Sequence, residues 1–82
     1  MSNTGEKIKQ VVIERLEINE DDVTMDADIQ KDLGADSITV VEMIIELEDA
    51  FDIDIPDEEA EKLRTIRDVV DYVQSRLAES EA

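Results

Sequence analysis

The sequence predicts an all-α fold: a small four-helix bundle with a long first loop and a short third helix. Apolar residues recur at the three- and four-residue spacing of a helix in three separate segments, and no run alternates for long enough to indicate a sheet. The chain has 82 residues, of which 24 are acidic and 8 basic, so its formal net charge is -16. A chain of this length has room for one core, and we expect residues 1–82 to form a single domain.

Three long helices are expected where the apolar periodicity is clearest. The first covers residues 5–17, and the second runs from Ser37 to Phe51 without an internal Gly or Pro. The last begins near Thr65, and its buried stripe comprises Ile66, Val69, Val70, Val73 and Leu77. We expect the tail from Ala78 to Ala82 to fray.

The segments between these helices carry different signals. Asp57 can cap a short third helix through Leu63. Residues 18–36 lose the helical period but keep five large apolar side chains, which is too many for a loose linker. This long loop should therefore pack on the bundle, with one helical turn that brings Ile29 and Leu33 together.

Composition excludes several classes of protein. There is no Cys and no His, so a thiol nucleophile, an imidazole base and a disulfide are all absent. The sequence shows no secretory or transit signal and no apolar run near the ~20 residues of a membrane span. We expect a monomeric cytoplasmic protein that binds no nucleic acid and does not insert into membranes. Its charge favours basic protein partners, although composition alone equally allows the acidity to serve solubility.

The second expected helix has two apolar faces. One is a stripe at core spacing, made of Val40, Ile44, Leu47 and Phe51. Ile38, Val41 and Ile45 gather on nearly the opposite side, where the long loop could cover them or a partner could bind them. Between Lys31 and Lys62 there is no basic residue, while half of all the acidic residues lie there. A solvated face usually explains such a run, but repulsion between acids one turn apart argues that local stability did not select it.

Ser37 stands where a loop turns into this helix. A helix N-terminus favours a phosphate group, because its free backbone N–H groups and its dipole attract negative charge. Asp36 can act as the N-cap with Thr39 at the third helical position, which would leave the Ser37 hydroxyl free. Taken alone, a serine before an apolar run is ordinarily only a helix cap.

The residues around Ser37 add a specific resemblance. Leu33-Gly34-Ala35-Asp36-Ser37, then Val41-Glu42, then Phe51, then the segment Ile55-Pro56-Asp57-Glu58-Glu59-Ala60-Glu61-Lys62, closely resemble the bacterial acyl carrier proteins of fatty-acid synthesis. The resemblance extends over nearly the whole chain, to Tyr72. Ile38 and Thr39 depart from the usual pattern, which affects the details of enzyme docking more than the attachment of a cofactor.

The resemblance implies a carrier and not a catalyst. A phosphopantetheinyl transferase would esterify Ser37, with Asp36 beside it, to 4'-phosphopantetheine donated by coenzyme A. The arm would carry acyl thioesters among fatty-acid synthase and acyltransferase enzymes that have basic docking patches. By position, the partner-contacting residues would be Asp36, Val41, Glu42, Ile45, Glu48 and Asp49. The lining of a sheltered acyl chain would be Val40, Ile44, Leu47 and Phe51.

Other functions fit the sequence less well. A calcium-sensor loop starting at Asp26 fails, because Lys31 stands where the loop needs Gly and Ser37 where it needs Glu. An enzyme would need a base or nucleophile of matched pKa in a pocket of its own. An acidic decoy for a basic surface remains a rival from another class, and a polyketide, aminoacyl or specialised lipid carrier remains open within the carrier class.

Overall fold

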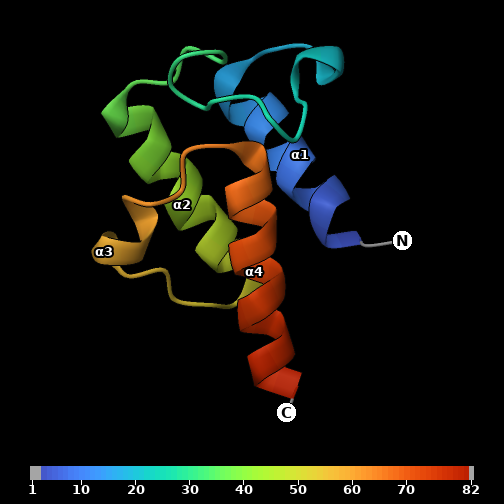
Figure 1. The fold of residues 1–82 in the computed structure, drawn as a ribbon, viewed down its shortest axis with the longest axis vertical. Helices are drawn as coiled ribbons and strands as arrows, with labels where there is room; N and C mark the ends of the chain where they lie inside the picture. The colour runs from blue at the N-terminus through green and yellow to red at the C-terminus, as the bar shows by residue number, and fades with distance from the viewer. Residues whose placement is uncertain (1–2, 82) are drawn as a thin grey trace.

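The computed structural model describes residues 3–81, and within them the fold is all-α, as the sequence predicts. Its elements in chain order are α1 (Asn3–Leu16), the 3-10 turn η1 (Glu20–Asp22), α2 (Ser37–Phe51), α3 (Asp57–Ala60) and α4 (Ile66–Glu81). Helix α1 packs against both α2 and α4, and the short α3 lies to one side of α2 (Figure 1). None of the described helices is both long and apolar enough to cross a membrane.

The expected helix limits hold best for α2, whose ends coincide with the prediction. Helix α1 begins and ends earlier than expected, and Glu17 follows it with a positive φ of 53°. Helix α3 stops at Ala60 and not at Leu63, because the chain then makes tighter turns in which Leu63 N–H donates to the Ala60 carbonyl at 3.1 Å. Helix α4 continues to Glu81, past Ala78, where the sequence predicts that fraying begins.

The long loop is packed on the bundle, as predicted. It arches over the end of the bundle where α2 and α4 begin (Figure 1). Ile29 and Leu33 are both buried, and a turn joins them in which the N–H of Asp32 donates to the carbonyl of Asp28 at 2.8 Å. Asp28 also accepts the N–H groups of Gln30 and Lys31 with one carboxylate oxygen, which holds the turn closed.

The loop is joined by backbone hydrogen bonds to the segment that leads into α4. Asp28 and Thr65 form an isolated antiparallel bridge, in which the N–H of Ile29 donates to the Arg64 carbonyl at 2.8 Å. One such bridge involves too few residues to leave a period in the sequence, which is why the periodicity did not reveal it. The bridge holds the loop before α2 and the link after α3 side by side.

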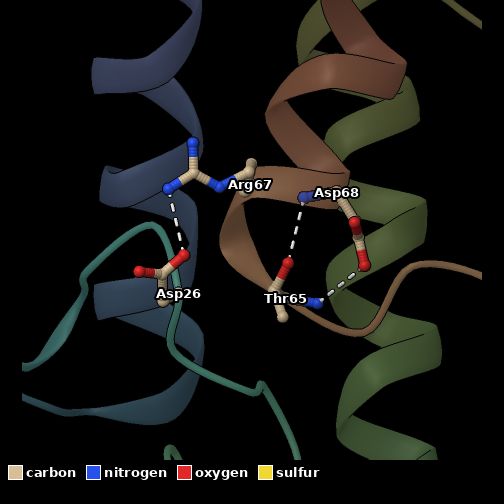
Figure 2. Close-up of polar contacts among 4 residues, drawn as sticks. All are labelled: Asp26, Thr65, Arg67 and Asp68. Carbon is tan, nitrogen blue, oxygen red and sulfur yellow. Dashed lines mark hydrogen bonds and ion pairs between the residues drawn. The ribbon is translucent and has the colours of Figure 1, made fainter.

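Helix α4 begins with a capping box, drawn in Figure 2. Thr65 Oγ1 accepts the N–H of Asp68 at 3.2 Å, and the Asp68 carboxylate accepts the N–H groups of Arg64 and Thr65 at 3.1 and 3.2 Å. These backbone donors, that of Arg64 first, hold the pKa of Asp68 below its ordinary value. Arg67 then reaches the loop, where it pairs with Asp26 at 3.0 Å (Figure 2).

Side chains from the three long helices and the loop form one apolar core. Its largest fully enclosed members are Ile8, Val12, Ile29, Met43, Leu47, Ile66, Val69 and Val73. Val40 and Phe51 are only partly buried at its edge. The core contains no buried charged residue among those described, so apolar packing holds the inner face of α2 in place.

Candidate functional site

Ser37 is the first residue of the 15-residue helix α2, and Asp36 caps that helix. The Asp36 carboxylate accepts the backbone N–H of Thr39 at 2.8 Å, which confirms the predicted cap. This bond holds the pKa of Asp36 below its ordinary value, so the carboxylate is ionised at neutral pH. Asp36 thus satisfies the capping position that Ser37 would otherwise fill.

The Ser37 side chain is consequently exposed and makes no hydrogen bond within residues 3–81. Gly34, three residues earlier, has a φ of +76°, a conformation that a residue with a side chain adopts only under strain. This glycine lets the loop turn sharply into Ala35, whose side chain is buried and anchors the approach to α2. The hydroxyl is therefore held at the positive end of a helix with its oxygen free.

The second apolar face of α2 is open to solvent. Ile38 is 71% exposed, Val41 56% and Ile45 52%. Full cover of this face by the long loop is therefore excluded, although Val41 and Ile45 share the wall of a cavity with residues of that loop. The three side chains form an apolar patch, and Glu42 and Asp49 beside it are exposed as well.

Two acids of α2 bond to other parts of the same chain. Glu46 pairs with Arg15 of α1 at 2.9 Å. Glu48 accepts the N–H of Ile55 at 2.8 Å with one carboxylate oxygen, and it is half-buried. The sequence predicts that Glu48 contacts partners. The structure shows that it also bonds to Ile55 within the chain, a contact that no spacing in the sequence indicates.

A cavity of about 920 Å³ opens directly beside Ser37. Its walls come from α2, the turn after residue 27, α3 and the link into α4. The apolar residues that line it are Ile29, Val40, Val41, Ile44, Ile45, Ile55, Ala60 and Leu63. This volume is within the usual range for small-molecule sites, so the cavity is large enough for an acyl chain.

Two of the four predicted lining residues are brought to this cavity and two are not. Val40 and Ile44 line it, whereas Leu47 is fully enclosed in the core and Phe51 lies further along α2, with the Lys7 ammonium 5.6 Å from its ring centre. Ile29, Ile55, Ala60 and Leu63 were missed, because they come from the loop and from the α3 region, which periodicity does not place next to α2. The shelter of an acyl chain by any of these residues stays a prediction.

The site fits a phosphopantetheine arm. The attachment oxygen is exposed and unbonded, it stands at the positive end of the α2 dipole, which suits a phosphodiester, and Ser37 also lines the cavity. The arm would supply the thiol that this chain lacks.

Comparison with known proteins agrees with this geometry. The family model described as a phosphopantetheine attachment site matches residues 6–73. The chain therefore belongs to the family of phosphopantetheine-attachment domains. A solved structure of the acyl carrier protein from Enterococcus faecalis is similar to this chain, with 40% sequence identity, a TM-score of 0.78, and coverage of 90% of this chain and 94% of the other. The resemblance to acyl carrier proteins is thereby confirmed.

Proposed function

We propose that this chain carries acyl intermediates of fatty-acid biosynthesis as thioesters on a 4'-phosphopantetheine arm attached to Ser37. The observation that supports this most strongly is the exposed, unbonded Ser37 hydroxyl at the start of α2, directly beside a cavity that has an apolar floor formed by residues such as Ile29, Val40 and Ile44. The hydroxyl can be reached by a transferase, and the cavity is placed to receive what the arm holds. The protein itself supplies attachment, shelter and recognition.

The chemistry of each transfer belongs to the partner enzymes. The chain has no Cys and no His, so it offers neither a thiol nor an imidazole for acyl transfer. The residues at the site do three other things: Asp36 fixes the start of α2, Ser37 holds the arm, and the apolar lining shields hydrocarbon from water. We therefore assign no catalytic residue.

Partner enzymes are proposed to dock on α2 through its exposed apolar patch and the acids beside it. Val41 and Ile45 supply apolar contact, and Glu42 and Asp49 attract a basic surface. Because these charges are exposed, they act mainly on the rate of association and are screened by salt. We further infer that the protein works in the cytoplasm and as a monomer; the repulsion between copies with a net charge of -16 supports the monomer.

The test is transfer of acyl groups from the loaded protein to purified fatty-acid synthase enzymes. Glu42→Lys should lower kcat/KM by about tenfold or less at low salt, and the difference should shrink as salt rises. Glu14→Lys makes the same charge change at an exposed position of α1 and should have little effect. Equal effects of the two variants, or rates of the unaltered protein that do not change with salt, would contradict docking on α2.

A further inference from the structure

Two basic side chains, Lys31 and Arg64, line the cavity beside Ser37. They come from segments more than thirty positions apart in the sequence, which the Asp28–Thr65 bridge and the hydrogen bond from Ile29 to Arg64 join into one wall. Helix α2 provides the facing wall. The fold therefore brings two of the eight basic residues of the chain to one cavity.

Neither of these cations forms an ion pair. Four other basic residues each have a carboxylate within 4 Å: Arg15, Lys62, Arg67 and Arg76. No carboxylate within the described part of the chain lies that close to Lys31 or Arg64, although acidic residues outnumber basic ones 24 to 8. The backbone N–H of Arg64 donates to Asp68, but its guanidinium acts on that carboxylate only at longer range.

Four acidic residues also line the cavity, but none of their carboxylates lies within 4 Å of either cation. Asp28 directs one oxygen to the backbone N–H groups of its own turn, and Glu48 directs one to the N–H of Ile55. Asp57 and Glu61 belong to the α3 side of the cavity. A ligand that entered between the walls would meet an apolar floor and two cations without close partners.

We propose that the cavity favours acyl groups that end in a carboxylate, with Lys31 and Arg64 binding the carboxylate while the hydrocarbon packs on the apolar floor. Arg64 can form two parallel hydrogen bonds to a carboxylate, and Lys31 adds a mobile point charge. The inference rests on the proposed function, because the arm on Ser37 delivers the acyl group to the cavity. The phosphodiester of the arm has a similar charge, so the test must separate the two anions.

The experiment compares two thioesters of equal chain length on the arm: glutaryl, which ends in a carboxylate, and pentanoyl, which does not. Hydroxylamine cleaves the thioester, and intact mass follows the rate, which falls when the acyl group is held in the cavity. For the glutaryl form, Lys31→Gln with Arg64→Gln should raise the rate roughly two- to tenfold, as expected for two exposed ion pairs. The pentanoyl form should not respond.

A matched double variant removes the same charge elsewhere. Lys9→Gln with Arg76→Gln alters two basic residues that do not line this cavity, and it should leave both rates unchanged. Salt at about 1 M, where the Debye length is about 3 Å, should raise the glutaryl rate of the unaltered protein toward that of the cavity variant. Urea unfolding of the unloaded cavity variant should match the unaltered protein, since the two side chains are exposed and unpaired.

Each remaining outcome overturns the inference. If the cavity variant accelerates the glutaryl and pentanoyl forms equally, the cations bind the phosphodiester and not the acyl carboxylate. If it accelerates neither, they bind no anion of the loaded protein. Mass analysis before the cleavage step separates these failures from failure of the proposed function, because only an unaltered chain that accepts no arm contradicts that function.

Discussion

Replacement of Glu48 tests whether this residue stabilises the fold in addition to any contact with partners. Its carboxylate accepts the N–H of Ile55, and its backbone carbonyl accepts the N–H groups of Asp52 and Ile53 that end α2. Glu48→Ala removes the first of these bonds and leaves a half-buried donor without its partner. A hydrogen bond to a charged group contributes about 1.5 to 3 kcal/mol, and the partial exposure of this one argues for a value at or just below the lower end of that range, about 1 to 2 kcal/mol.

Urea denaturation of the unloaded protein measures this loss directly. Glu42→Ala is the matched control, because it makes the same substitution on the same helix at an exposed residue without a side-chain hydrogen bond, and it should change the free energy of unfolding by less than about 0.5 kcal/mol. The Glu48 loss corresponds to a fall of about 4 to 16 °C in Tm for a domain of this size. Glu48→Gln, which keeps an acceptor oxygen, should lose less. Equal stabilities of the two alanine variants would refute this structural role for Glu48.

Three further predictions concern the backbone, the charge and the core. Gly34→Ala should destabilise the fold by about 1 to 2 kcal/mol because of its positive φ, whereas Gly5→Ala, in the first turn of α1, should stabilise it by at most about 0.5 to 1 kcal/mol; thermal unfolding of the two variants tests whether Tm falls for the first and rises for the second. Two backbone N–H groups before α4 lower the pKa of Asp68 in the folded state, so its contribution is present above the unfolded value of 3.8 and is lost as the pH falls through the lower folded value. The difference in unfolding free energy between the unaltered protein and Asp68→Asn should therefore be larger at neutral pH than near about pH 2, and a difference independent of pH would contradict this. Leu47→Ala should cost about 2 to 5 kcal/mol in urea unfolding, whereas Val41→Ala should stay within about 0.5 kcal/mol; equal costs would mean that the two faces of α2 are not core and surface.

Much of this fold follows from local signals in the sequence. The ends of α2 were predictable because Asp36 caps its first turn and because its interior lacks Gly and Pro. The burial of Ile29 and Leu33 was predictable because a spacing of four residues in one helical turn puts both side chains on the same side, where the bundle can cover them. The exposure of Val41 needed the structure, since two apolar faces on one helix can both be buried.

The walls of the cavity could not be predicted in the same way. Ile55 and Leu63 reach the site through a short helix and a single backbone bridge, which depend on the packing of segments distant in sequence. The different surroundings of Val40 and Leu47 also depend on the packing of segments distant in sequence. Both belong to one stripe at helical spacing, but α2 turns the first toward the cavity and the second into the core.

The central claim is that the free hydroxyl of Ser37 is the attachment point of the arm. Its most direct test is the intact mass, followed by peptide mapping, of the chain after incubation with coenzyme A and a phosphopantetheinyl transferase. We expect one 4'-phosphopantetheine per chain, located on the peptide that contains Ser37, and none on Ser37→Ala. An unaltered chain that gains no mass, or a Ser37→Ala chain that gains the same mass, would contradict the claim.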